Sequence, residues 1–208
     1  MRTLHVVTHP QATHHVDDVV GGWYDSDLTP DGERDARRIA AALRDRIPDT
    51  ADVELRTSDL RRTAQTADAI GERFGLTPVP DPRLRELSFG EAGGRPNAWL
   101  RECFVPPPPT GDRMGHTGGL PGAESKRHLA QRVYAAVDDL LDHHCEHQIV
   151  VTHGIAITFV IAAWIGMPAD SLGHVVFKVT SGSITTLHED DLYRGRMVTA
   201  LGDTRHLH

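Results

Sequence analysis

Two histidines stand directly after similar apolar runs that lie far apart in the sequence. His9 follows TLHVVT at residues 3–8, and His153 follows QIVVT at residues 148–152. Runs rich in β-branched residues are typical of buried strands. An imidazole at the end of such a strand can act as a nucleophile, an acid–base group or an anion ligand. The alternative for each is an ordinary polar residue at a strand end or in the core.

Other polar groups fall close to predicted strand ends. Ser58 directly follows DVELRT at residues 52–57, another predicted strand, and the Arg61-Arg62 pair begins the next helical pattern. Glu86 lies in a later loop, where Glu91 could compete with it. A neutral imidazole can attack phosphorus, a guanidinium and a second imidazole can hold the phosphoryl oxygens, and a carboxylic acid can protonate the leaving oxygen. These residue types therefore favour phosphoryl transfer.

The elements that must position these groups alternate between strands and helices. Helical spacing is expected over 29–47, 59–74, 124–140 and 155–165, and strand-like runs over 3–8, 52–57, 148–152, 174–179, 183–189 and 196–201. Thr29, and then Ser58 or Asp59, are the predicted N-caps of the first two helices. This alternation predicts an α/β fold, a three-layer α/β/α sandwich with a mostly parallel sheet. Ligands of such sheets bind beyond the carboxyl ends of the strands.

The chain is expected to form a single domain over residues 1–208. Between residues 92 and 123 the periodicity fails, and Gly, Pro and a PPPP run dominate. A connection of this length is unusual inside a compact domain. We therefore expect a lid or flap over the site.

Composition excludes several classes of protein. The net charge of −7 argues against binding nucleic acid, although a small anion needs only a local positive site. Cys103 and Cys145 form neither a disulfide framework nor a metal pattern. No apolar run reaches the ~18 residues of a membrane span, and no signal-peptide core follows Met1. A cytoplasmic protein without a membrane partner is expected.

Five segments, in order, resemble the histidine phosphatase superfamily, also called phosphoglycerate mutase-like. They are YDSDLTPDGERDARRIAAAL, TSDLRRTAQTADAI, LRELSFGEAGG, PGAES and VVTHG, and the resemblance covers essentially the whole chain. It implies the phosphoglycerate mutase-like fold and hydrolysis of a small phosphorylated metabolite through a phosphohistidine on His9. It also implies that Glu86 is the proton donor, that Arg62, His153 and Gly154 bind the phosphoryl group, and that no cofactor is needed.

The first motif departs from the family pattern of Arg-His-Gly. Thr8 and Pro10 flank His9, and His14 and His15 stand where Trp and Asn are usual. A threonine cannot supply a charged bidentate clamp, and proline has no N–H to donate. His15, together with His14, is expected to compensate beside Thr8 when protonated, so that phosphate affinity rises as pH falls. The alternative is that both histidines simply line a polar loop.

Several alternatives remain open at this stage. The altered motif suits a degenerate family member that binds an anionic ligand without hydrolysis, or an enzyme whose activity is weakened or redirected. A phosphomutase is a further possibility within the family. His143 and His147 have the i, i+4 spacing of a zinc site, but no third ligand is indicated and no metal is expected. One of the late strand-like runs could be an edge strand that supports a homodimer.

Overall fold

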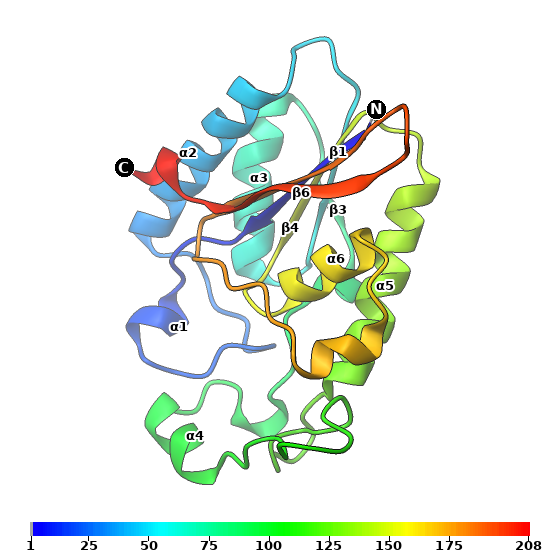
Figure 1. Ribbon diagram of the computed structural model, residues 1–208. Helices are drawn as coiled ribbons and strands as arrows, with labels where there is room; N and C mark the ends of the chain where they lie inside the picture. Colours follow the sequence, from blue (N-terminus) through cyan, green and yellow to red (C-terminus); the bar gives the residue numbers. More distant parts are fainter. Residues whose placement is uncertain (1) are drawn as a thin grey trace.

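The computed structural model describes residues 2–208, and within them the strands form one six-stranded sheet (Figure 1). Its strands are β1 Arg2–Thr8, β2 Val53–Thr57, β3 Val79–Pro80, β4 His147–Thr152, β5 Ile184–Glu189 and β6 Arg196–Asp203. The spatial order is β3-β2-β4-β1-β5-β6. The pairings among β3, β2, β4 and β1 are parallel, whereas β5 is antiparallel to both of its neighbours.

Two helices cover each face of the sheet. Helices α2 Pro30–Arg46 and α3 Arg61–Phe74 pack on one face, and α5 Lys126–Asp142 and α6 Ala156–Trp164 pack on the other (Figure 1). The short elements are α1 Thr13–Val16, α4 Asn97–Cys103 and the 3₁₀ helices Pro82–Leu84, Gly90–Ala92, Ala169–Gly173 and Arg205–Leu207. The predicted three-layer α/β/α sandwich is confirmed. Within residues 2–208, no helix is both long and apolar enough to cross a membrane.

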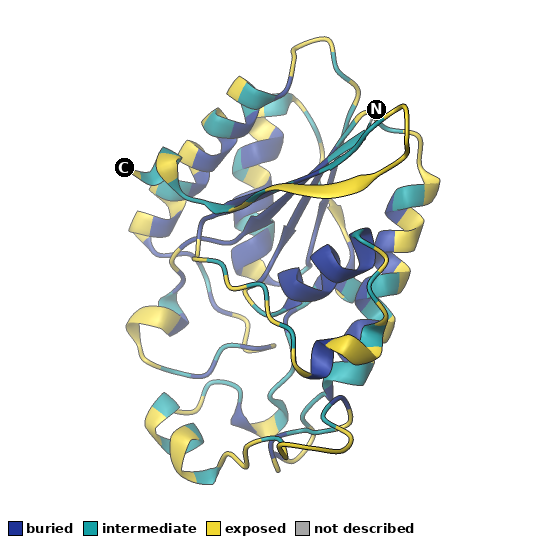
Figure 2. Cartoon of the chain, viewed as in Figure 1, coloured by how far each residue is buried: buried dark blue, intermediate teal, exposed yellow. Residues whose placement is uncertain are grey.

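The central strands are buried on both faces, which explains why apolar residues occupy consecutive positions in them (Figure 2). Alternate residues of β1 and β4 point to opposite faces. Val6 and Val150 belong to the cluster under α5 and α6, whereas Val7 and Val151 belong to the cluster under α2 and α3. A strand buried on both faces favours apolar residues at consecutive positions, as in Val6-Val7 and Ile149–Val151, and the buried His5 and Gln148 are polar exceptions.

The register of the sheet brings the predicted site residues together. β1 and β4 are neighbours, and Thr8 lies opposite Thr152. The His9 N–H donates to the Thr152 carbonyl over 3.2 Å, and the Ser58 N–H donates to the Val151 carbonyl over 2.9 Å. The residues that follow β1, β2 and β4 therefore meet at the carboxyl edge of the sheet.

One predicted helix cap is confirmed and another is wrong. Thr29 Oγ1 accepts the Gly32 N–H over 3.0 Å at the start of α2. The N-cap of α3 is Leu60, not Ser58 or Asp59, and its side chain accepts no capping bond. The Ser58 hydroxyl contacts His153 instead, so a long-range contact overrides the local capping preference.

The strand predicted over 174–179 is wrong. This segment is irregular and follows α6, where the Phe177 N–H donates to Thr158 Oγ1 over 3.2 Å. The segment packs its apolar side chains on the cluster that contains α6 and pairs with neither of the edge strands, β3 and β6. The runs 183–189 and 196–201 do form β5 and β6, and β6 is an edge strand.

Residues 92–123 hold the short helix α4 and otherwise irregular chain. Figure 1 shows α4 and the loops around it gathered at one end of the molecule, away from the helices that flank the sheet. The segment folds on itself, because the Val105 N–H donates to the Gly118 carbonyl over 2.9 Å. Its movement as a lid stays a prediction.

Candidate active site

A cavity of about 200 Å³ opens at the carboxyl edge of β1 and β4. It is lined by Thr8, His9, His14, His15, Gly21, Gly22, Arg62, Glu86, Phe89, Gly154, Val179 and Ser181. The structure thus brings all but one of the predicted site residues to a single cavity. The exception is His153, which is fully buried beside it, with its ring centroid 5.2 Å from that of His9.

His9 is held in one tautomer by its two hydrogen bonds. Arg62 Nε lies 3.2 Å from His9 Nε2, and a guanidinium N–H can only donate, so Nε2 accepts. The proton of the neutral ring is therefore on Nδ1, which donates to the Pro10 carbonyl over 2.9 Å. Burial, and then the charge of Arg62, hold the pKa of His9 well below its usual range. His9 thus presents a neutral ring whose lone pair lies at Nε2.

Arg62 is the main fixed positive charge of the cavity. Its side chain is 1% exposed, and its two terminal nitrogens donate to the carbonyls of Tyr24 (2.9 Å) and Gly22 (2.7 Å). Burial lowers its pKa to about 10, so the guanidinium stays charged at neutral pH. The two main-chain carbonyls fix its orientation before any anion arrives.

His153 is buried next to His9, and its ring forms a hydrogen bond with Ser58. His153 Nε2 lies 2.9 Å from Ser58 Oγ, whereas its buried Nδ1 has no hydrogen-bond partner among the described residues. Burial, followed by the charges of Arg62 and His9, holds the pKa of His153 well below its usual range. When Ser58 donates to Nε2, the proton of His153 is on Nδ1, where it has no acceptor among the described residues.

Glu86 is a buried carboxyl group at the first turn of α6. Oε1 accepts the N–H groups of Leu87 (2.9 Å) and Ala156 (3.0 Å), and Oε2 accepts that of Ile155 (2.9 Å). Burial raises the pKa of Glu86, and these three bonds oppose the rise only in part. Oε2 accepts one bond from the protein and has room for a proton. A raised pKa and a place on the cavity wall suit a proton donor.

Glu91 and Arg61 do not reach the cavity. Glu91 is exposed, and its N–H donates to the Pro121 carbonyl over 3.1 Å. Arg61 is exposed too and forms an ion pair of 2.7 Å with Asp27. Position therefore favours Glu86 over Glu91 as the acid and Arg62 over Arg61 as the anion ligand.

The model of the histidine phosphatase superfamily (branch 1) matches residues 4–198. The chain belongs to this superfamily. A probable phosphoglycerate mutase, GpmB, from Yersinia enterocolitica is 32% identical, and the match covers 100% of this chain and 95% of the relative.

Solved structures of the superfamily have the same fold. A mycobacterial glucosyl-3-phosphoglycerate phosphatase in complex with VO3 superposes with a TM-score of 0.80 at 26% identity, covering 98% of this chain and 100% of that chain. YhfR from Bacillus stearothermophilus gives a TM-score of 0.79 at 25% identity, with full coverage of both chains.

In this member of the superfamily, the hydroxyl of Thr8 forms hydrogen bonds within the protein rather than with the cavity. Its hydroxyl donates to the Thr180 carbonyl over 2.8 Å, lies 3.1 Å from Ser183 Oγ and accepts the Ser183 N–H over 3.2 Å. The one proton of the hydroxyl is thus already committed. This geometry argues against the predicted role of Thr8 as a phosphate ligand.

His14 and His15 both line the cavity, and burial lowers the pKa of each imidazole. Burial and His15 lower the pKa of His14 to about 3, and burial and Arg62 lower the pKa of His15. The prediction that His14 becomes charged between pH 5 and 8 is therefore wrong for the free protein. His15 Nδ1 accepts the Ala12 N–H over 3.1 Å, so the neutral ring carries its proton on Nε2. His15 can offer a hydrogen bond without a charge.

Sequence reasoning missed the residues that support the site. Trp23 Nε1 and Arg132 Nη2 both donate to the Glu86 carbonyl, over 2.6 and 2.8 Å, and so fix the backbone of the acid. Val179, the last residue of the segment that was expected to be a strand, and Ser181, which follows it, both reach the cavity. No sequence signal marks contacts to main-chain carbonyls, because any residue supplies a carbonyl.

The two histidines with zinc-like spacing lie outside this cavity. His143 Nδ1 lies 3.3 Å from Glu54 Oε1, whereas the His147 ring stacks on His5 with centroids 5.8 Å apart. Within residues 2–208, no three His, Cys, Asp or Glu side chains are arranged to hold a metal ion.

Proposed function

We propose that this chain hydrolyses the phosphomonoester of a small metabolite through a phosphohistidine formed on His9. The observation that carries the proposal is the hydrogen bonding of His9, which leaves a neutral ring with its lone pair at Nε2 beside Arg62. A nucleophile must be deprotonated and aimed before its substrate binds. The phosphatases among the related structures agree with hydrolysis.

In the first step, the Arg62 Nε–H turns from His9 Nε2 to a phosphoryl oxygen of the bound ester, and the lone pair that this frees on Nε2 attacks the phosphorus atom. The P–N bond forms as the bond between phosphorus and the ester oxygen breaks, and the electron pair of that bond goes to the oxygen. Glu86 gives its proton to this oxygen, so the alcohol leaves neutral and Glu86 becomes a carboxylate. The raised pKa of Glu86 keeps the proton available for this transfer.

In the second step, water attacks the phosphorylated His9. The Glu86 carboxylate takes a proton from the water as its oxygen bonds to phosphorus. The P–N bond breaks, its electron pair returns to Nε2, and inorganic phosphate leaves. Glu86 is protonated again, so His9 and Glu86 both return to their starting states.

Charge on the transferred group is balanced by groups that are already oriented. Arg62 supplies a charged donor, His153 Nδ1 and His15 Nε2 supply neutral donors, and Gly154 leaves open space at the cavity wall. Preorganised donors of this kind supply much of the rate enhancement in phosphoryl transfer. Arg62 alone among these donors carries a permanent charge, and the turnover number is expected to be modest for this reason.

Two other activities fit individual observations. The relative named as a probable phosphoglycerate mutase favours transfer from His9 to a second hydroxyl instead of to water. The commitment of the Thr8 hydroxyl to Thr180 favours a member that binds an anion without hydrolysing it. Hydrolysis is preferred because a nucleophile, an acid and a charged ligand meet at one cavity.

The test is the release of inorganic phosphate from a panel of phosphomonoesters by the wild-type chain and by His9→Ala. His144→Ala is the matched control, since this histidine is exposed and lies in the loop before β4. Release that persists in His144→Ala and vanishes in His9→Ala supports the proposal. Isomerised ester without phosphate release would indicate a mutase, and bound phosphate without turnover would indicate a non-hydrolytic member.

A further inference from the structure

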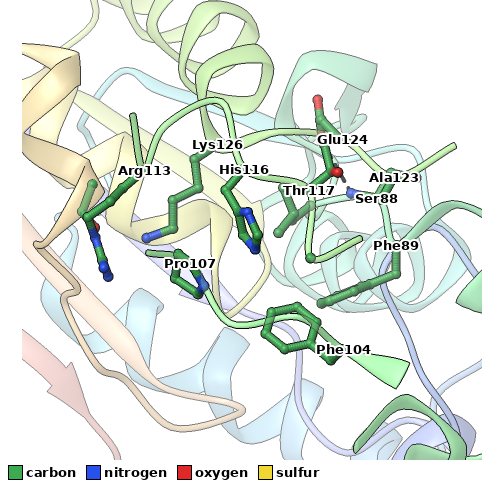
Figure 3. Close-up of a pocket in the computed structure, with 13 residues that line it drawn as sticks. Ser88, Phe89, Phe104, Pro107, Arg113, His116, Thr117, Ala123, Glu124 and Lys126 are labelled. Carbon is green, nitrogen blue, oxygen red and sulfur yellow. Dashed lines mark hydrogen bonds between the residues drawn. The ribbon is translucent and has the colours of Figure 1, made fainter. Parts of the chain in front are cut away.

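A second cavity, of about 90 Å³, lies between residues 87–89 and the segment that leads into α5 (Figure 3). Its walls are formed by Leu87, Ser88, Phe89, Phe104, Pro107, Arg113, His116, Thr117, Gly118, Ala123, Glu124, Lys126 and Gly173. Phe89 also lines the cavity that holds His9, so this residue belongs to the walls of both cavities. The second cavity therefore lies next to the place of a phosphoryl group bound at His9.

Two cations face this cavity without a carboxylate partner. Figure 3 shows Arg113, Lys126 and His116 on neighbouring walls. Lys126 Nζ donates to the Leu172 carbonyl over 3.1 Å, and Arg113 Nε donates to the Gly173 carbonyl over 2.8 Å. Among residues 2–208, neither side chain forms an ion pair with an acidic residue. Burial, and then the charge of Arg113, lower the pKa of Lys126, as expected where two cations are close together.

The carboxylates nearby are engaged by other arginines. Both oxygens of Glu124 accept from Arg132 over 2.7 Å. Asp112 and Asp170 both bind Arg127, over 2.8 and 2.9 Å. Uncompensated positive charge at one cavity is unusual in a chain with a net charge of −7. An anion is the ligand that this arrangement favours.

Apolar side chains form much of the remaining wall of the cavity. Phe89 and Phe104 flank the approach to the cations, and the Phe104 ring packs edge-on against His116 at 6.5 Å. Gly118 has a φ of +70°, and a Cβ at this position would lie 2.3 Å from the Phe104 ring. The loop can therefore close on Phe104 only with glycine at position 118. Such walls suit a short apolar spacer between two charged groups.

We propose that this second cavity binds an anionic group on the alcohol part of the substrate, a carboxylate or a second phosphate, through Lys126 and Arg113. The proposal rests on the function proposed above and narrows its substrate class to phosphomonoesters that carry a second negative charge. The small volume limits the group to about the size of a carboxylate or a phosphate.

The test is calorimetric binding of phosphonates, which cannot be hydrolysed and so report binding without turnover. The probes are alkylphosphonates of increasing chain length that end in a carboxylate, a second phosphonate or a neutral amide. Wild-type protein is expected to bind an anionic probe about tenfold or more tightly than the amide of equal length, for at least one length. A preference for the carboxylate or for the second phosphonate shows which anion the cavity takes.

Variants then assign the preference to the two cations. Lys126→Met and Arg113→Gln are each expected to bring the ratio of the two affinities close to one, with affinity for the amide unchanged. Lys126→Arg keeps the charge and should keep the preference. Arg101→Gln, on the exposed side of α4, removes a lid cation outside the cavity and is the matched control. Thermal unfolding of each variant shows whether it is folded, and Arg113→Gln remains decisive if Lys126→Met is not.

Two results would overturn the proposal. One is equal affinity for anionic and neutral probes at every length, and the other is a preference that survives both Lys126→Met and Arg113→Gln. Failure of the proposed function has a different signature. In that case the anionic probes keep their advantage, but the corresponding phosphate esters are not hydrolysed. If hydrolysis depends on His9 but the protein shows no preference for anionic probes, the proposed function stands and only the anion binding at the second cavity is rejected.

Discussion

The two Thr-His strand ends are neighbours in the sheet with similar sequences, yet they differ in every contact of the imidazole. At the end of β1, the His9 ring binds the Pro10 carbonyl and Arg62 and faces a cavity. At the end of β4, the His153 ring is 0% exposed and binds Ser58. The Thr8 hydroxyl donates to the Thr180 carbonyl and accepts the Ser183 N–H, whereas Thr152 Oγ1 donates to the Leu84 carbonyl over 2.8 Å.

The Thr-His dipeptide places each histidine at the carboxyl edge of the sheet. The groups around each ring then determine which nitrogen carries the proton and which hydrogen bonds the ring forms. The Pro10 carbonyl directs the proton of His9 to Nδ1, which leaves Nε2 as a nucleophile. After β4, the N–H groups of Ile155 and Ala156 are taken by Glu86, so this strand end positions the acid. In the proposed mechanism, one strand end supplies the attacking atom, and the other supplies a ligand and holds the proton donor.

The largest expected effect is the loss of turnover in His9→Ala, which should exceed the loss in His153→Ala. His9→Ala should lower turnover by at least ~10⁴-fold, since the covalent route is lost. His153→Ala should lower it by ~10²–10³-fold, because one oriented donor is lost. Steady-state rates of phosphate release measure both. Equal losses in the two variants would contradict the division into nucleophile and ligand.

Glu86→Gln is expected to have the next largest effect, and the effect should depend on the leaving group. For an alkyl phosphate, kcat should fall by ~10²–10⁴-fold, because the alkoxide then leaves without a proton. For 4-nitrophenyl phosphate the loss in the first step should be much smaller, since a nitrophenolate leaves readily without protonation. A burst experiment isolates that step, and an equal loss for both esters would exclude Glu86 as the acid.

The pH dependence should follow from the opposite pKa shifts of these groups. Burial raises the pKa of Glu86, so the reactive acid form persists to higher pH and activity falls as pH rises through that pKa. The pKa values of His9 and His153 are lowered by burial, so both rings stay neutral as pH falls below 6.5. The alkaline decline of kcat should be absent in Glu86→Gln. A decline that persists in this variant would assign it to another group.

The smallest effects are expected at the two threonines. Thr8→Val and Thr152→Val each remove a buried hydroxyl bonded to a carbonyl and should lower the free energy of unfolding by about 1–3 kcal/mol. Phosphate affinity should change less than about threefold in both, because neither hydroxyl is free to bind an anion. Urea unfolding and phosphate titration measure the two quantities. A large loss of affinity confined to Thr8→Val would make Thr8 a phosphate ligand after all.

The strand ends were predictable from sequence because strands buried on both faces leave long β-branched runs. Parallel pairing then places the residues after these runs at one edge, which is how His9, Ser58 and His153 could be grouped. The same apolar pattern misled at 174–179, since a segment that covers a helix also alternates apolar and polar residues. The periodicity of apolar residues does not distinguish a segment that pairs with a strand from one that covers a helix.

The remaining features depend on partners that sequence does not reveal. Ser58 was expected to cap α3, but its hydroxyl meets a histidine that lies 95 positions further along the chain. The expected charge on His14 is wrong because burial lowers its pKa to about 3, and burial depends on the whole fold. Sequence does not show that Lys126 and Arg113 lack ion pairs, because this depends on the neighbouring carboxylates binding other arginines in the fold.

The central claim is that His9 Nε2 becomes phosphorylated during turnover. The most direct measurement is rapid alkaline quenching of the enzyme with a hydrolysed phosphomonoester, followed by proteolysis and mass spectrometry of the peptide that contains His9. The account predicts one phosphoryl group on His9, more of it in Glu86→Gln with 4-nitrophenyl phosphate, and none in His9→Ala. Turnover with no phosphorylated peptide, or with the phosphoryl group on another residue, would contradict the account.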